Sequence, residues 1–170
     1  MGLHSRMIVT ITYLEMLSPS DLTPKRTPDE RFRICEILPP RWEFNRSSYV
    51  AAGKDWSWTD KLGWTDAQWK AYAESPNMRT FGAYLGAAQA GYYELNQDES
   101  LDIEIAYFGL LPEFLGLGFG GAMLTHALQT AWMMQPQRVW VHTCSLDHPA
   151  ALKNYLARGM RIYKEENKKA

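Results

Sequence analysis

Short stretches in which apolar and polar residues alternate recur along the chain, and a period of two residues is typical of half-buried β-strands. The first is 7–17, where Val9 and Ile11 alternate with threonines. The stretches 78–86 and 89–96 flank a turn of small residues, so we expect an antiparallel hairpin there. Three further strands are predicted at 101–110, 138–146 and 160–165.

Other segments show apolar residues at helical spacing. A helix is predicted at 45–54, and a second begins at Thr65, because Gln68 three residues later completes a capping box. A third helix follows the strand 101–110. Its apolar residues share one face and are Met123, Leu124, Ala127, Leu128 and Ala131.

The last helix is predicted from Asp147 as its N-cap through Arg158, with Gly159 as the terminating residue. The stretch 32–38 forms either a short strand or a helical turn, which two prolines stop. The predicted order is therefore one strand, two helices, three strands, and then helix, strand, helix and strand. Strands and helices in this order predict an α/β fold.

Four glycines, at 116, 118, 120 and 121, lie between the strand 101–110 and the third helix. Such a turn lets a ligand approach the backbone and leaves the first helical N–H groups free, so it suits a phosphate or pyrophosphate. A nucleotide-triphosphatase loop is excluded, because it requires Gly-Lys-Ser/Thr and the chain reads Gly120-Gly121-Ala122. A dinucleotide fingerprint fits poorly, because no acidic residue stands about 20 positions later.

Composition narrows the class of protein. The 170 residues are 46% hydrophobic and 22% charged, which suits a single globular domain over 1–170. The net charge of −1 without a basic block argues against a nucleic-acid partner. No apolar run reaches the ~18 residues of a membrane helix and no signal peptide is evident, so we expect no membrane partner and a cytoplasmic location. Cys35 and Cys144 stand far apart, and neither a metal site nor a disulfide is predicted.

The glycine turn resembles the acetyl-CoA-binding motif of the GCN5-related N-acetyltransferase (GNAT) superfamily. The chain reads Leu110-x-Pro-Glu-Phe-x-Gly-x-Gly-x-Gly, where members typically read V-x-P-x-x-R/Q-G-x-G-x-G/A. A second motif, Tyr155 four residues before Gly159-Met160, matches the closing signature of the family. The resemblance implies a mixed, mostly antiparallel central sheet flanked by helices. It is firm from about residue 78 onward, and residues before that match in element order.

The same resemblance implies acetyl-CoA as co-substrate. Backbone amides of the turn would hold the pyrophosphate, and the strand before it would pair with the pantetheine arm. Leu115 stands where members carry Arg or Gln, and His148 stands where many carry an Asn. The implied cofactor-binding residues are Phe108, Gly109, Leu110, Leu115, Gly116, Leu117, Gly118, Phe119, Gly120, Gly121 and His148.

Two residues are predicted to carry proton transfer. Glu104 lies in the strand before the turn, where partial burial would raise its pKa and suit it to act as general base. The resemblance favours Glu104 over Asp102, although both could simply occupy the solvent face of a strand. His142 is a competing base. Tyr155 matches the family position of the general acid, and its alternative role is packing of the last helix on the sheet.

The aromatic-rich segment 18–77 lies where the family places its acceptor-binding helices, and five of the seven tryptophans fall in it. Aromatic faces attract cations, so we expect some of these side chains to receive a protonated amine. The alternative is that they fill the core, and this is favoured for Trp69 and Tyr72. The predicted acceptor-binding residues are Trp56, Trp58, Asp60 and Trp64.

The predicted reaction is direct acetyl transfer from acetyl-CoA to a primary amine. A covalent route through Cys144 is less favoured, because no histidine stands beside it with evident activating geometry. The acceptor could be a small amine or a protein terminus, and a homodimer is suggested by the frequency of dimers in the family. Two rival hypotheses remain: a non-catalytic acyl-CoA-binding module, and an acyltransferase that uses a longer acyl-CoA.

Overall fold

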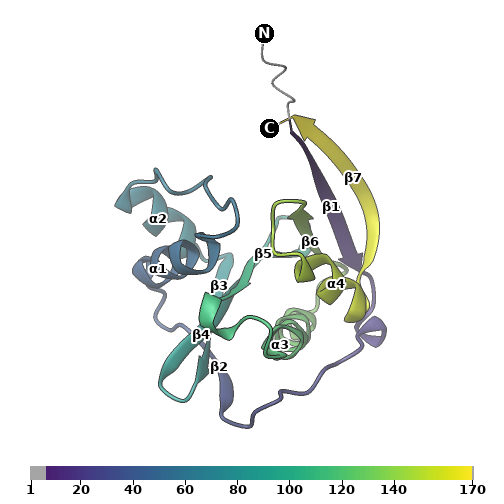
Figure 1. Ribbon diagram of the computed structural model, residues 1–170, viewed down its shortest axis with the longest axis horizontal. Helices are drawn as coiled ribbons and strands as arrows, with labels where there is room; N and C mark the ends of the chain where they lie inside the picture. Colours follow the sequence, from purple (N-terminus) through teal and green to yellow (C-terminus); the bar gives the residue numbers. More distant parts are fainter. Residues whose placement is uncertain (1–6, 170) are drawn as a thin grey trace.

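The computed structural model describes residues 7–169 and contains one seven-stranded sheet (Figure 1). The strands are β1 (Ile8–Met16), β2 (Phe32–Glu36), β3 (Met78–Leu85), β4 (Ala88–Gln97), β5 (Ile103–Leu110), β6 (Val139–Cys144) and β7 (Arg161–Lys169). The α-helices are α1 (Trp42–Gly53), α2 (Asp66–Ala73), α3 (Phe119–Met133) and α4 (Ala150–Ala157). Two short 3₁₀-helices, η1 (Pro19–Asp21) and η2 (Pro112–Phe114), complete the described elements.

The strands lie in the order β2-β3-β4-β5-β6-β1-β7, and every neighbouring pair is antiparallel except β5 with β6. The mixed, mostly antiparallel α/β fold expected from the sequence is thereby confirmed. The stretch 32–38, for which two alternatives were open, contains the edge strand β2 paired with β3. None of the helices within residues 7–169 has both the length and the apolar character needed to cross a membrane.

The sheet opens in its middle. Within the described chain, β5 and β6 pair at two positions, Ile103 with Val139 and Glu104 with Trp140, and then diverge. Beyond Glu104, β5 keeps its hydrogen bonds to β4. On its other edge it no longer pairs with β6. A backbone edge therefore lies free in the middle of the sheet rather than at its rim.

The first strand is held between the last two. β1 pairs with β6 on one side, with Ile11 opposite Cys144, and with β7 on the other side, with Ile11 opposite Glu166. Figure 1 shows β1 and β7 as a long ribbon with the start of β1 beside the end of β7. The two ends of the described chain are thus brought together in one sheet.

Helices cover both faces of the sheet, as the packing of two neighbouring residues of β4 indicates. Tyr93 belongs to an apolar core with α3, whereas Tyr92 belongs to a second core with Tyr49 of α1 and Trp69 of α2. Because successive side chains of a strand point to opposite faces, α3 and the α1–α2 pair lie on opposite sides. The second core consists mainly of aromatic side chains.

Local signals explain most helix boundaries. The capping box predicted at α2 is present, since the Gln68 backbone N–H donates to Thr65 Oγ1 (3.2 Å) and the Thr65 N–H donates to Gln68 Oε1 (2.9 Å). The cap predicted at Asp147 is wrong. Its carboxylate turns back to accept hydrogen bonds from Thr143 and Cys144, and α4 begins at Ala150 instead.

Candidate active site

Two connected cavities lie where β5 and β6 diverge. We call the larger, of about 560 Å³, the splay cavity, because side chains of both strands line it. The smaller, of about 390 Å³, is the glycine cavity, because the glycine turn lines it. Seven residues line both cavities and mark their junction, namely Phe108, Gly109, Leu110, Leu115, His148, Ala151 and Tyr155.

The glycine turn has the backbone geometry that its sequence predicts. Gly116 and Gly118 have φ angles of 75° and 89°, in the left-handed region that side chains disfavour. Gly118 is the N-cap of α3, so the helix begins immediately after it. The free N–H groups at that end and the helix dipole together favour an anion in the glycine cavity.

The glycine cavity is also lined by three cationic residues that the sequence analysis did not single out, Lys25, Lys153 and Arg158. A Cβ built on Gly121 would meet side-chain atoms of both Lys25 and Arg158. Lys25 is fixed from behind, since its backbone N–H donates to Thr125 Oγ1 on α3 (2.9 Å). Positive side chains are therefore present although Leu115 replaces the usual Arg or Gln. No sequence signal could have revealed Lys25, because its loop meets α3 only in the folded chain.

Most of the predicted cofactor-binding residues line the cavities, and two do not. Among the described residues, Leu117 and Phe119 are absent from the lining of either cavity. The Leu117 side chain is exposed, whereas the Phe119 ring is buried and stacks on Phe32 with centroids 4.8 Å apart. The side chain of Phe119 is therefore not available to a ligand.

Glu104 and His142, which the sequence left as competing bases, lie together in the splay cavity. His142 Nδ1 is 3.8 Å from Glu104 Oε1. Burial raises the pKa of Glu104, and the positive charges of protonated His142 and of Lys61 partly oppose this rise. Asp102 instead pairs with Arg138 (3.1 Å) and is not among the described residues that line a cavity. Of Glu104 and Asp102, which the sequence analysis compared, Glu104 is the one that lines a cavity among the described residues.

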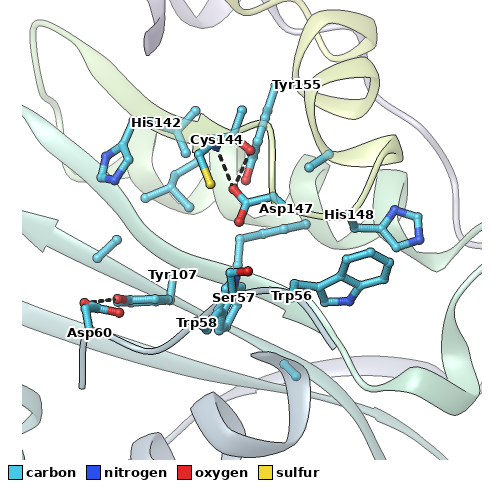
Figure 2. A pocket seen from close by; sticks show the side chains of 18 of the residues that line it. Trp56, Ser57, Trp58, Asp60, Tyr107, His142, Cys144, Asp147, His148 and Tyr155 are labelled. Carbon is cyan, nitrogen blue, oxygen red and sulfur yellow. Dashed lines mark hydrogen bonds between the residues drawn. The ribbon is translucent and has the colours of Figure 1, made fainter. Parts of the chain in front are cut away.

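Tyr155 projects from α4 to the junction of the two cavities (Figure 2). Its ring meets Phe108 of β5 with centroids 6.1 Å apart. Burial, and secondly the charge of Asp147, raise the pKa of the Tyr155 phenol. The phenol is consequently protonated at neutral pH and available as a proton donor.

The loop between α1 and α2 closes one side of the splay cavity. The Trp56 ring meets the His148 ring edge to face at 4.8 Å, so the loop reaches the start of α4 (Figure 2). His148 Nδ1 accepts the backbone N–H of Ala150 (3.0 Å), which fixes this ring at the junction. Trp58 packs against Tyr49 and Tyr107 as well as lining the cavity. Both tryptophans are therefore cavity walls with structural contacts of their own.

The predicted amine-binding group around Asp60 and Trp64 is filled by the protein itself. Lys61 Nζ lies 4.7 Å from the Trp64 ring centroid, 5.1 Å from that of Tyr72 and 4.8 Å from that of Tyr107. It also donates to Asp60 Oδ2 (2.9 Å). Trp64 is not among the described residues that line either cavity. Lys61 thus occupies the aromatic cage at Asp60 and Trp64, and the other rings of the cage, Tyr72 and Tyr107, are not among the predicted acceptor-binding residues.

A buried carboxylate, Glu94 of β4, lies behind this cage. Its side chain is 1% exposed and accepts a hydrogen bond from the hydroxyl of Tyr72 (3.0 Å), which lines the splay cavity. Burial raises the pKa of Glu94 to about 7, with hydrogen bonds from Tyr72 and Asn45 opposing the rise. Sequence reasoning missed Glu94, because a lone Glu in a strand is normally taken to face solvent.

Comparisons with known proteins agree with this architecture. A family model described as "Acetyltransferase (GNAT) family" matches residues 33–160. A search of curated proteins finds no match. The solved structures that resemble the chain include a GCN5-related N-acetyltransferase from Sphaerobacter thermophilus, with a TM-score of 0.70 and 15% identity over 95% of this chain and 52% of that one. A GCN5-related N-acetyltransferase from Kribbella flavida has a TM-score of 0.66 and 16% identity over 92% and 55% of the two chains.

An aminoglycoside acetyltransferase from an uncultured soil metagenomic sample gives a TM-score of 0.63 and 14% identity over 78% of this chain and 90% of that one. At such identities the likeness concerns the fold. The chain spans 50–60% of the length of the first four structures that it resembles. Because the family model covers well over half of the chain, and the sheet is shared with solved structures of this family, the chain belongs to the GNAT acetyltransferase family.

Proposed function

We propose that this chain is a single domain that transfers an acetyl group directly from acetyl-CoA to a primary amine. One observation carries the proposal: an anion-binding turn opens, through a junction that holds a buried phenol, into a cavity that holds a half-buried carboxylate. These are the parts that acyl transfer to an amine requires, namely a held thioester, a base and an acid.

In this proposal the glycine cavity receives the pyrophosphate of acetyl-CoA. The backbone N–H groups at the start of α3 donate to it, and Lys25 and Arg158 add positive charge. The pantetheine arm then follows β5 from Leu110 to Phe108. That edge of the strand is free of β6, so its backbone groups can pair with the amides of the arm as an added strand would.

Proton transfer is assigned to two residues. Glu104, with His142 beside it, takes a proton from the ammonium of the acceptor, and the freed lone pair forms a bond to the thioester carbon. As the carbon–sulfur bond breaks, the electron pair goes to sulfur, and the phenol of Tyr155 donates a proton there. The nitrogen, now bonded to the acyl carbon, gives its second proton to the Tyr155 phenolate, which restores the phenol and leaves a neutral amide. The raised pKa of Glu104 makes its carboxylate a stronger base, and the Tyr155 phenol carries the proton that it donates.

Direct transfer is favoured over a cysteine intermediate by the environment of Cys144. Burial raises the pKa of this thiol, and Asp147 adds to the rise by its negative charge. The thiolate that a covalent route needs is therefore disfavoured.

The acceptor is proposed to be a small amine or a protein terminus that enters the splay cavity beside Trp56 and Trp58. A longer acyl group is a second candidate for the donor side. Val9, Ile11 and Val141 give the splay cavity apolar walls beyond the junction, and an acetyl group alone would leave these walls uncovered.

Calorimetric titration with acetyl-CoA is the first test. We expect binding by the native protein and none by Gly118→Glu, in which a side chain blocks the turn. With an amine acceptor found by screening for CoA release, Glu104→Gln and Tyr155→Phe should each lower kcat by at least about a hundredfold. Glu99→Gln and Tyr163→Phe, both at exposed positions, are the matched controls. Unchanged turnover in both site variants would refute the roles given to Glu104 and Tyr155, whereas acetyl-CoA binding without CoA release for any amine would favour a non-catalytic acyl-CoA-binding module.

A further inference from the structure

We propose that Lys61 is a positioning residue for proton transfer at Glu104. Its ammonium is fixed inside an aromatic cage and supplies a positive charge to the cavity that Lys61 and Glu104 both line. The inference rests on the proposed function, which it deepens by explaining how a carboxylate in this cavity stays able to accept a proton.

The cage holds the ammonium from several sides. The rings of Trp64, Tyr72 and Tyr107 lie within 5.1 Å of Nζ, and two N–H groups donate to Asp60 Oδ2 (2.9 Å) and Tyr107 Oη (3.1 Å). Asp60 is itself fixed, because the hydroxyls of Tyr49 (2.8 Å) and Tyr107 (2.7 Å) donate to it. A lysine normally samples many rotamers in solvent, whereas this one has a defined place.

Exposure decides which charge of the Lys61–Asp60 pair acts on the cavity. The side chain of Lys61 is 12% exposed, whereas that of Asp60 is 58% exposed. Water screens the carboxylate more than the ammonium, so the pair does not cancel within the protein. The remaining field is positive and is felt by groups on the same face of the sheet.

Glu104 is faced by charged or titratable groups from each neighbouring element. They are Lys61 of the α1–α2 loop, Tyr72 of α2, Glu94 of β4, Asp98 of the β4–β5 turn and His142 of β6. Glu94 and Asp98 are negative when ionised, and a negative neighbour makes ionisation of Glu104 harder. His142 is half-exposed, and its Nδ1 lies 3.8 Å from Glu104 Oε1. Lys61 is the lysine in this set, and its ammonium is held in the cage with the side chain 12% exposed.

Burial and Lys61 act on the pKa of Glu104 in opposite directions. Burial raises the pKa of Glu104, and Lys61 pulls that pKa back down. Without the ammonium, Glu104 would keep its proton to higher pH and would accept one from the acceptor only in more alkaline solution. Lys61 therefore acts through Glu104, and it neither donates to nor accepts from the reacting atoms in this proposal.

The test measures the titration of Glu104 without any substrate. The carboxyl ¹³C shift of Glu104, assigned with Glu104→Gln, is followed against pH in the native protein and in Lys61→Met, which keeps the bulk and removes the charge. We expect the midpoint to rise by on the order of one pH unit in Lys61→Met. Lys61→Arg, which keeps the charge, should stay within a few tenths of a unit.

Two further measurements distinguish the loss of the Lys61 charge from a disturbance of the fold around it. In Lys61→Ala, added propylammonium should enter the vacated cage and lower the Glu104 midpoint toward its native value, whereas Lys61→Met should not respond because methionine fills the cage. In Lys61→Met, the acidic limb of the plot of kcat/KM against pH should move to higher pH together with the Glu104 midpoint. A purely structural Lys61 would lower the rate at every pH and leave the limb where it is.

An unchanged Glu104 midpoint in folded Lys61→Met, with no response of Lys61→Ala to propylammonium, overturns the inference. The proposed function fails independently of it. A protein that shows the expected titration shifts but transfers no acetyl group refutes the proposed reaction, and a protein that transfers acetyl groups while its titration is unmoved refutes the role of Lys61.

Discussion

Replacing Glu94 by Gln should change how the stability of the fold depends on pH. Glu94 is buried, and its pKa is raised from 4.5 to about 7. In the unfolded chain the same carboxyl releases its proton near the ordinary value. The folded protein therefore binds one more proton than the unfolded chain between these two pH values, and stability must fall as pH rises through this window.

The magnitude follows from the size of the shift. At about 1.4 kcal/mol per pKa unit, the ionisation of Glu94 lowers the free energy of unfolding by about 3 kcal/mol between pH 4.5 and 7. The amide that replaces the carboxyl in Glu94→Gln has no proton to lose in this range, and its carbonyl can still accept the hydroxyl of Tyr72. The variant should therefore gain about 3 kcal/mol relative to the native protein over this window, whatever its stability at pH 4.5.

Urea unfolding at several pH values between 4.5 and 8 measures this difference. Subtracting the two curves removes every titration that the proteins share, so the remaining slope belongs to Glu94. The variant Glu99→Gln, at an exposed position, should follow the native protein at all pH values. If the gap between native protein and Glu94→Gln is constant across the window, Glu94 ionises normally and the account of its burial is wrong.

Three other changes test the glycine turn and a helix cap. Lys25→Ala should weaken acetyl-CoA binding, measured by calorimetry, about tenfold at low salt and less at high salt, because a charge-assisted phosphate contact is lost. Lys54→Ala, at an exposed position, is the control and should bind acetyl-CoA as the native protein does. Gly118→Ala should cost roughly 1–2 kcal/mol of stability from its φ of 89°, since the nearest atom to the new Cβ lies at an ordinary 3.5 Å; an unchanged Tm would contradict the strain. Thr65→Ala should cost about 1 kcal/mol in urea unfolding through the lost cap of α2, and Thr59→Ala should not.

Local signals in the sequence predicted much of the fold. The glycine turn, the capping box at Thr65 and the alternating strands each depend on neighbours within a few residues, and each is present in the structure. The cap predicted at Asp147 failed because a nearer competitor exists. The hydroxyl of Thr143 and the N–H of Cys144 donate hydrogen bonds to this carboxylate. Both residues precede Asp147, whereas a helix-capping rule considers only the residues that follow the cap.

The site could be predicted only in part, because long-range contacts decide it. Glu104 and Tyr155 were found through a motif or a strand position, and both line the splay cavity. The cage around Lys61 requires α2, β5 and the loop between α1 and α2 to meet, and alternation within a strand does not reveal such meetings. Lys25 reaches the glycine turn across about a hundred residues of sequence, which no local pattern reports.

The place of β1 between β6 and β7 has a consequence for how the chain folds. Among the described strands β1 is synthesised before the others, whereas its partners β6 and β7 come after the other four, so the sheet is closed by contacts of very large sequence separation. Such closure is slow. Since Ile8 lies opposite Lys169, a short linker could join β7 to β1 as an ordinary hairpin. A circular permutant opened in the loop 22–31 would keep every strand pair, and stopped-flow refolding should show it folding faster than the native order.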